Sequence, residues 1–429
     1  MGAHADLLAR HRQVMPSWLA HYYAEPISIV RGEGRHVWDA EDNQYLDLFG
    51  GILTTMVGHA VPEVVEAIQQ QAARMLHTST LYLIEPMIAL AEKIAGLSNI
   101  PDARVFFANS GGEANDTALL LATSYRGSNQ VLTMRGSYHG GSFSTMPLTN
   151  IASWRSSSLS PFQVGYVHGG YRYRSPFGHL PDDQYIDACV ADLRDVLAMM
   201  GSNVAALIAE PIQGVGGFTV PPDGMFGAFA RVLREHGILW ISDEVQTGWG
   251  RTGEHFWGWE AHGETPDMVT FAKGVGNGLS MGGVVARAEL MNSVQGNHIS
   301  TFGGNPLVSA GALATLEYLL DNDLQTNAVK VGNLILNRFR DIAQETPMIG
   351  EVRGKGLMCG VELVQPGTKT PDAAAASAAL EGARRAGVLI GKGGLSGNVL
   401  RIAPPLSLTE DEANTALDAL AGVFESLKS

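Results

Sequence analysis

The segment Arg104-Val-Phe-Phe-Ala-Asn-Ser-Gly-Gly-Glu-Ala114 joins a short apolar run to a glycine-rich turn and then to a helical pattern. This order is typical of the strand-to-helix junctions of α/β folds. The same alternation continues along the chain, with predicted strands at 104–108, 130–134, 204–208 and 238–242 and predicted helices at 113–125, 185–199 and 224–236. The sequence therefore predicts an α/β fold whose mostly parallel sheet is covered by helices on both faces.

The two ends of the chain have a different pattern. Residues 20–55 are expected to form a helix followed by short strands at 37–39 and 45–48. The predicted elements of the tail are strands at 350–363, 388–390 and 399–402, a helix at 373–387, and a last helix that opens with the capping box Thr409 and Glu412.

This pattern predicts two domains. Residues 1–55 and 325–429 are expected to form one small α+β domain, which packs on a large domain of residues 56–324. Within the large domain, the segment 151–184 has no clear period and is expected to be a long functional loop.

The composition is that of an acidic globular protein. Of 429 residues, 45% are apolar, and 29 basic against 43 acidic side chains give a net charge of −14. This charge argues against binding to nucleic acid or to an anionic membrane surface. Only two cysteines are present, and the first ten residues lack the apolar core of a signal peptide, so we expect a cytoplasmic protein.

Lys273 is the most informative single residue. It follows the apolar run in Asp267-Met-Val-Thr-Phe-Ala-Lys-Gly-Val-Gly-Asn-Gly278, and three glycines come within the next five residues. Burial lowers the pKa of a lysine, which suits a nucleophile that forms a Schiff base. The alternative is a lysine at a strand end that extends its charge to solvent.

Asp243 ends a second apolar run, Leu239-Trp-Ile-Ser-Asp-Glu-Val-Gln246. An acid in this place can bind a metal, cap the following turn, or hold the pyridine nitrogen of pyridoxal phosphate in its protonated form. A metal is disfavoured because the neighbouring acid, Glu244, should point to the opposite side of the strand. The free backbone N–H groups after Ser110 suit a phosphate, and Tyr138 offers an aromatic face for a planar ring.

Together these segments resemble the class III aminotransferases, which are pyridoxal-phosphate enzymes of fold type I. The resemblance runs from about residue 25 to 425. It is carried by Ser110-Gly-Gly-Glu-Ala114, Tyr138-His-Gly140, Glu210-Pro-Ile-Gln213, Asp243-Glu-Val-Gln246, Ala272-Lys-Gly274, Ser300-Thr-Phe-Gly-Gly-Asn-Pro306 and Leu400-Arg-Ile-Ala-Pro-Pro405. Within the class, Arg353-Gly-Lys-Gly-Leu-Met358 and Gly397-Asn-Val-Leu-Arg401 are most like the alanine–glyoxylate aminotransferase 2 group.

The resemblance implies a seven-stranded, mostly parallel sheet and a set of residues that bind pyridoxal 5'-phosphate. Lys273 would hold the cofactor as an internal aldimine and move the proton during the reaction. The other implied cofactor-binding residues are Asp243 at the pyridine nitrogen, Gln246 at the ring hydroxyl, Tyr138 and Val245 on the two ring faces, and Ser110, Gly111 and Gly112 at the phosphate. Thr301 would reach the phosphate from a neighbouring subunit, which implies a homodimer with shared sites.

The resemblance also implies residues that bind the substrate. Arg401 would bind its carboxylate, and Glu210 could pair with Arg401 when a substrate lacks an α-carboxylate. Tyr82, His77 and the 166–177 loop are further candidates for the substrate pocket.

The expected reaction is ping-pong transfer of an amino group from an amine or amino acid to pyruvate, glyoxylate or 2-oxoglutarate. One alternative is a phospholyase or decarboxylase of the same class, since Arg155, Arg172 and Arg174 would suit a phosphorylated substrate. The other is a binding protein that has kept the fold without the catalysis.

Overall fold

A computed structural model of the chain describes residues 3–201 and 203–428. Within these residues the largest sheet has seven strands in the order β4-β10-β9-β8-β7-β5-β6, and β10 alone runs antiparallel to its neighbours. The strands are β4 (Ala103–Ala108), β5 (Gln130–Met134), β6 (Gln163–Val167), β7 (Val204–Ala209), β8 (Leu239–Asp243), β9 (Met268–Ala272) and β10 (Gly282–Arg287). The predicted α/β fold with a mostly parallel seven-stranded sheet is confirmed.

Helices cover this sheet, because its central strands are mostly apolar and are buried on both faces. Every residue of β7 and of β8 is buried. The main helices of this part are α3 (Pro62–Arg74), α4 (Glu85–Leu97), α5 (Gly111–Arg126), α6 (Asp182–Met200), α7 (Met225–Glu235), α8 (Ala288–Met291) and α9 (Pro306–Asp321). The three helices predicted in this part are present as α5, α6 and α7.

The two ends of the chain meet in a shared sheet of order β1-β2-β3-β13, in which β13 pairs in parallel with β3. A second sheet has the order β11-β12-β15-β14. The strands of both sheets are β1 (Ile29–Glu33), β2 (His36–Asp39), β3 (Gln44–Asp47), β11 (Ile349–Lys355), β12 (Met358–Leu363), β13 (Val388–Leu389), β14 (Gly391–Gly393) and β15 (Val399–Ile402). The helices here are α1 (Ala3–Val14), α2 (Gly50–Leu53), α10 (Leu324–Gln344), α11 (Ala373–Arg385) and α12 (Glu410–Leu427).

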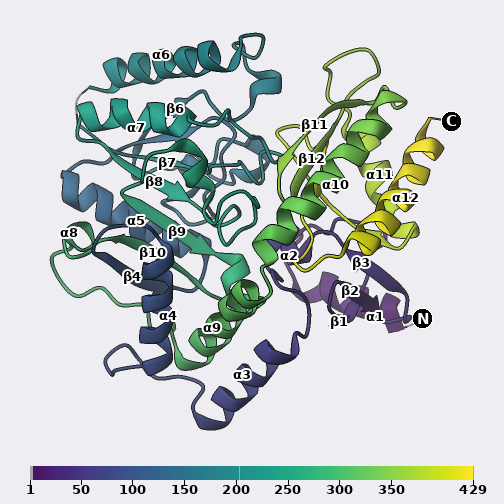
Figure 1. The fold of residues 1–429 in the computed structure, drawn as a ribbon, viewed down its shortest axis with the longest axis horizontal. Coiled ribbons are helices and arrows are strands. Elements are labelled where there is room, and N and C mark those ends of the chain that lie inside the picture. The colour runs from purple at the N-terminus through teal and green to yellow at the C-terminus, as the bar shows by residue number, and fades with distance from the viewer. Residues whose placement is uncertain (1–2, 202, 429) are drawn as a thin grey trace.

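Figure 1 shows the seven-stranded sheet and its helices on one side of the molecule, with the two smaller sheets, α11, α12 and both chain ends on the other. The domain boundaries at residues 55 and 324 stay a prediction. The predicted capping box of α12 is present, because the Thr409 hydroxyl accepts from Glu412 N and the Glu412 carboxylate accepts from Thr409 N.

Three local predictions are wrong. No helix lies in residues 20–55 before the first strand; the N-terminal helix is α1, and β1 is the first element after residue 20. The predicted loop 151–184 contains β6, an edge strand that pairs only with β5. The run 350–363 is a hairpin of β11 and β12 rather than one strand, because the chain turns at Gly356, whose φ is +51°.

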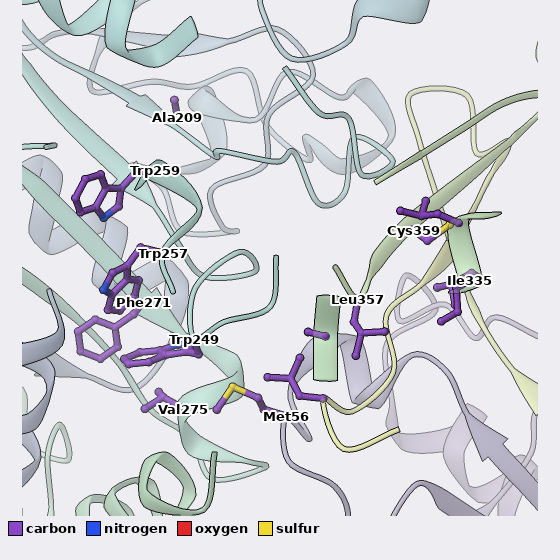
Figure 2. Close-up of a cluster of buried hydrophobic side chains, with 14 of the residues drawn as sticks. Met56, Ala209, Trp249, Trp257, Trp259, Phe271, Val275, Ile335, Leu357 and Cys359 are labelled. Carbon is purple, nitrogen blue, oxygen red and sulfur yellow. The ribbon is translucent and has the colours of Figure 1, made fainter. Parts of the chain in front are cut away.

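A buried aromatic group packs beneath the turn that carries Lys273. Trp249 lies 4.6 Å from Trp257 and 5.5 Å from Phe271, measured between ring centroids. Figure 2 shows these rings beside Val275 and Met56, with Leu357 and Cys359 across from them. Each fully buried large apolar side chain contributes roughly 1.5–3 kcal/mol, so this packing holds the turn firmly. No helix in the described part of the chain is long and apolar enough to cross a membrane.

Candidate active site

The carboxyl ends of five strands meet at one cavity of about 490 Å³. This is the edge at which α/β sheets bind ligands, since the loops that follow parallel strands converge there. The predicted site residues that line the cavity are Ser110, Gly111, Gly112, Tyr138, Glu210, Asp243, Val245, Gln246 and Lys273. They follow or end β4, β5, β7, β8 and β9, so the sheet order brings together residues that are far apart in sequence.

Lys273 stands at the end of β9 in an unusual backbone conformation. Its φ is +48°, which costs roughly 1–2 kcal/mol for a residue with a Cβ. The following turn is held by Asn277, which accepts from Val57 N at 3.0 Å and donates to Gly58 O at 3.0 Å. Lys273 Nζ makes no hydrogen bond to any described residue, and burial lowers the pKa of its ammonium. A lysine amine in such surroundings is a good nucleophile.

Asp243 is buried and held by three donors. Its Oδ2 accepts from Asn115 Nδ2 at 2.8 Å and lies 2.7 Å from His139 Nδ1, and its Oδ1 accepts from Val245 N at 3.1 Å. His139 Nε2 in turn lies 3.1 Å from the Thr133 hydroxyl, which fixes the ring. The carboxylate is thus presented in one orientation, as a partner for a cationic nitrogen must be.

Glu244, the next residue, faces away from the cavity as predicted. Its carboxylate accepts from Gly258 N and Trp259 N, both at 2.8 Å, and from two hydroxyl groups. Burial raises the pKa of Glu244 to about 7. This acid therefore anchors a loop and does not contribute to the cavity.

The start of α5 lines the end of the cavity at which a phosphate is predicted to bind. Ser110 caps the helix by accepting from Glu113 N at 3.2 Å, so the N–H groups of Gly111 and Gly112 begin the first turn. Gly140 packs closely here: a Cβ on it would lie 2.9 Å from Gly112 Cα. The Glu113 carboxylate turns back and accepts from Asn109 N at 2.9 Å. Free N–H groups of this kind bind anions.

The residues present fit pyridoxal phosphate. The cavity volume lies in the range of roughly 300–1,000 Å³ that is usual for cofactor sites. Gln246 Oε1 is buried and accepts no hydrogen bond from any residue that the structure describes, which is unusual unless a ligand supplies one. A Cβ on Gly214 would come within 2.2 Å of the Gln246 amide, so this glycine is what leaves room for the side chain.

Glu210 and Arg401 both bind the backbone of Gly214, Glu210 at its N–H and Arg401 at its carbonyl. Glu210 accepts from Gly214 N at 2.8 Å and from Tyr138 N at 2.9 Å, and burial raises the pKa of its carboxyl. Arg401 Nη1 donates to Gly214 O at 3.3 Å. The two side chains form no ion pair in this structure, so their predicted pairing stays a prediction.

Arg401 is 2% exposed, yet it forms an ion pair with none of the described residues. Its Nη2 donates to the Tyr22 hydroxyl at 3.2 Å, its Nε has no partner, and the rings of Phe49 and Phe218 lie beside it at 4.9 and 5.6 Å. A buried guanidinium without a counter-charge is a ready site for a carboxylate.

Several predicted residues lie away from the cavity. Thr301 and Tyr82 are exposed, and the His77 ring packs against Phe302 at 5.0 Å. In the predicted substrate loop, Tyr171 and Arg174 bind Glu362, and Arg172 binds Asp182. These side chains are committed to contacts within the protein.

Four residues beside the predicted ones were not predicted from the sequence: His139, Asn115, Gly214 and Tyr22. His139 and Asn115 lie inside segments that were recognised, so a search of those segments for a partner of Asp243 could have found them. Tyr22 and Gly214 offered no local signal, because each meets Arg401 across more than 180 residues of sequence.

The sequence model described as "Aminotransferase class-III" matches residues 19–424. Mitochondrial alanine–glyoxylate aminotransferase 2 of Homo sapiens is 35% identical over 438 residues, which cover 96% of this chain and 84% of that protein.

Solved structures of the same kind superpose on nearly the whole chain. An (S)-enantioselective omega-transaminase from Thermomicrobium roseum has a TM-score of 0.92 and 33% identity, and each chain is covered completely. An amine transaminase from an uncultivated Pseudomonas species, in its PLP-bound form, has a TM-score of 0.90 and 31% identity, covering 96% of this chain and 98% of that one. A phospholyase from Arthrobacter in complex with phosphoethanolamine has a TM-score of 0.90 and 32% identity, covering 98% and 100%.

Proposed function

The chain belongs to the class III aminotransferases, enzymes that use pyridoxal 5'-phosphate, and from that premise we propose that it moves an amino group from an amine or amino acid to a keto acid such as pyruvate, glyoxylate or 2-oxoglutarate. One observation carries the proposal. Lys273, Asp243 and the start of α5 line one cavity, and near it lies a buried Arg401 without a counter-charge. The reaction then runs as two half-reactions at the same site.

The cofactor, when bound, acts as an electron sink for the carbon that carries the amino group. Lys273 is the residue that would hold the cofactor covalently, and its Nζ would carry the mobile proton, which the lowered pKa of this lysine makes possible. Asp243, oriented by His139 and Asn115, binds the pyridine nitrogen. Gln246 would bind the ring hydroxyl, and Tyr138 and Val245, which line the same cavity, would hold the ring between them.

Ser110, Gly111 and Gly112 bind the phosphate, and a Cβ on Gly112 would find 3.8 Å of room before its first neighbour. A serine at this position should therefore fit and add a hydroxyl donor.

Arg401 binds the carboxylate of the keto acid as a two-pronged donor. Tyr22, which already accepts from Arg401 Nη2, steadies the guanidinium. Glu210 is connected to Arg401 through Gly214, whose N–H it accepts and whose carbonyl binds Arg401. Its role as a partner of Arg401 for donors without an α-carboxylate is part of the proposal.

We also propose a homodimer in which Thr301 completes the phosphate site of the partner subunit. Thr301 lies beside Phe302, which is 60% exposed, and the nearby segment 81–83 exposes Leu81, Tyr82 and Leu83 by 75, 68 and 94%. The two segments are neighbours, because Thr80 and Ile299 line one surface cavity. Exposed apolar side chains gathered in this way mark a protein interface.

Thr301→Ala tests the homodimer. It should weaken cofactor binding by about 1.5–3 kcal/mol, the value of one hydrogen bond to a charged group. A protein that sediments as an active monomer would contradict the shared site.

The rival function is a phospholyase, and one of the similar structures is named as one. Two of the three arginines that would suit a phosphorylated substrate are occupied, Arg174 by Glu362 and Arg172 by Asp182. This observation favours transamination. Release of inorganic phosphate from phosphoethanolamine, measured beside amino transfer, distinguishes the two reactions.

The test of the main proposal is a screen of the first half-reaction. Candidate amines and amino acids are added one by one to the holoenzyme, and the cofactor absorbance is followed as the aldehyde form gives way to the amine form. Lys273→Ala is the control; it should retain the cofactor and lose general acid–base catalysis of roughly 10²–10⁴-fold. A holoenzyme that responds to no amine would support the alternative of a binding protein.

A further inference from the structure

Arg401 has a counterpart two strands away in the same sheet. Arg353 on β11 lies opposite Gly360 on β12, and Gly360 lies opposite Arg401 on β15. Residues directly opposite each other in a sheet point to the same face, so the two arginines share one face and are separated by a glycine. Both are buried, with 9% of Arg353 and 2% of Arg401 exposed.

Both arginines bind the same loop. Arg353 Nε donates to Gly217 O at 2.9 Å, and Arg401 Nη1 donates to Gly214 O at 3.3 Å. Gly360 lets the loop come this close, because a Cβ there would lie 2.7 Å from Gly217 O. The position of the 213–219 loop on this face therefore decides where Arg401 can be held.

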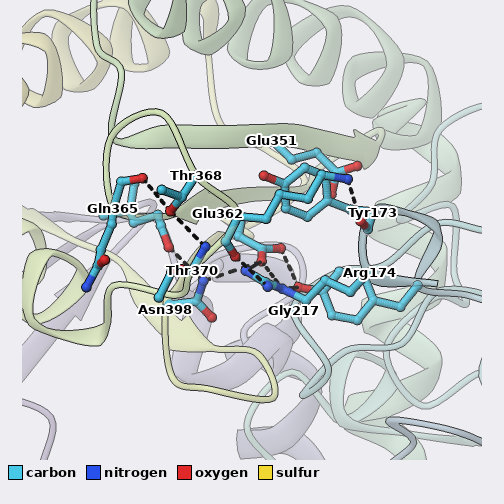
Figure 3. A network of polar contacts seen from close by, with 12 residues as sticks. Tyr173, Arg174, Gly217, Glu351, Glu362, Gln365, Thr368, Thr370 and Asn398 are labelled. Carbon is cyan, nitrogen blue, oxygen red and sulfur yellow. Dashed lines mark hydrogen bonds and ion pairs between the residues drawn. The ribbon is translucent and has the colours of Figure 1, made fainter. Parts of the chain in front are cut away.

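Glu362 differs from every acid near the cavity in the number of cations it holds. It accepts from Arg353 Nη1 and from Arg174 Nε, both at 2.7 Å, and from the Tyr171 hydroxyl. Figure 3 shows Glu362 at the centre of this network, with Arg174 and Gly217 beside it. Glu362 is fully buried, and all its acceptor positions are used within this cluster.

Through these partners Glu362 fixes two loops of the larger part of the molecule. Arg353 reaches Gly217, and Tyr171 and Arg174 belong to the segment that follows β6. That segment also packs on the first loop, since a Cβ on Gly170 would lie 2.8 Å from Gln213 Oε1. The 213–219 loop is thus held from both sides.

We propose that Glu362 is a positioning residue for substrate binding: by holding Arg353, Arg174 and Tyr171 it fixes the 213–219 loop, and so keeps Arg401 on the Gly214 carbonyl with its remaining N–H groups open to a carboxylate. Because Glu362 is fully occupied by its own partners, it also leaves Arg401 without a counter-charge. The inference rests on the proposed role of Arg401. It assigns a substrate-binding effect to a residue outside the cavity.

The test uses Glu362→Gln in the holoenzyme and a carboxylate that cannot react, propionate. Calorimetric titration should show propionate binding weakened roughly 3- to 10-fold, while cofactor absorbance per subunit stays that of the unaltered enzyme. In an Arg401→Ala background, the second change should add nothing, because the effect passes through Arg401. A purely structural role of Glu362 would not produce this dependence on Arg401.

Two further variants complete the design. Tyr171→Phe keeps the ring and removes one hydrogen bond to Glu362, so it should weaken propionate binding in the same direction but less. It decides the question if Glu362→Gln fails to fold. Arg338→Gln breaks the exposed pair with Asp418 and should leave propionate binding unchanged.

The outcomes distinguish failure of the positioning role of Glu362 from failure of the proposed role of Arg401. Unchanged propionate affinity in a folded Glu362→Gln or Tyr171→Phe protein overturns the positioning role. An equal loss with and without Arg401 overturns it too. If Arg401→Ala alone binds propionate as well as the unaltered enzyme, the proposed role of Arg401 is the one that fails.

Discussion

Arg353 and Arg401 lie in one row of one sheet and are both buried, yet their surroundings are opposite. Arg353 binds two carboxylates, those of Glu351 and Glu362, whereas Arg401 binds only a carbonyl and a hydroxyl group. A buried charge with partners belongs to the fold, and a buried charge without one is a cost that a ligand can remove. Of the two arginines, the one proposed to bind substrate is therefore the one whose interactions the protein leaves incomplete.

Replacing Arg353 by methionine should have the largest effect on stability. Arg353→Met keeps the bulk but leaves Glu362 with a buried charge and fewer partners, at a loss of about 3 kcal/mol. Urea unfolding of the holoenzyme measures it, with Arg338→Gln as the matched surface pair, whose loss should stay under about 1 kcal/mol. Equal losses in the two variants would show that the Arg353 cluster is no more than a surface ion pair.

Replacing Arg401 should act on the reaction instead. Arg401→Ala should slow the keto-acid half-reaction roughly 100-fold, since it removes charge-assisted hydrogen bonds to the substrate carboxylate. Arg401→Lys should recover only part of the rate, because an ammonium cannot bind a carboxylate in two-pronged fashion. In rapid-mixing experiments, the rate with pyruvate should decrease more than the rate with an amine that has no carboxylate. An equal decrease in both rates would contradict the proposed difference between Arg401 and Arg353.

The same substitution that destabilises one position should be tolerated at the other. Arg401→Met removes an unpaired buried charge, so the free energy of unfolding should change by no more than about 1 kcal/mol in either direction. Urea unfolding beside Arg353→Met makes the contrast direct. A loss as large as that of Arg353→Met would mean that Arg401 has a structural partner after all.

Acid should reduce the stability that the Arg353–Glu362 pair contributes and should not act through Arg401. This is the smallest of the expected effects. Burial by itself would raise the pKa of Glu362, but Arg353 and the hydrogen bonds of the cluster outweigh it and lower the pKa. A lowered pKa means that this contribution to stability is complete above the ordinary value of 4.5 and is lost as the pH falls through the folded-state value. Thermal melts from pH 6 downward should therefore converge for the unaltered enzyme and Glu362→Gln; parallel curves would contradict the assignment.

Most of the large sheet could be predicted from sequence, because its strands are continuous apolar runs. Residues 204–209 are buried on both faces, and such an apolar run can be recognised as a buried strand from its own sequence. β6 was missed because it is an edge strand interrupted by Gly165. Residues 20–28 were mistaken for a helix because distant contacts fix them, such as Ala24 N to the Glu381 carboxylate at 2.7 Å.

That Lys273 and Asp243 line one cavity could be predicted, because each stands at the end of an apolar strand; their cofactor roles stay a prediction. The substrate side could be predicted only in part. Arg401 stood out in its motif, but its neighbours Tyr22 and Gly214 come from remote segments. The full occupation of Glu362 is a property of the folded cluster, which no local pattern in sequence displays.

The left-handed backbone at Lys273 has a consequence for anyone who evolves this protein in the laboratory. Glycine adopts a φ of +48° without strain, so Lys273→Gly should relieve the backbone and raise the melting temperature of the protein without cofactor. A library selected only for heat resistance or yield should therefore enrich variants that have lost the amine proposed here to be catalytic. Screens of this scaffold must score turnover in every round, or their winners will be well-folded proteins that no longer catalyse anything.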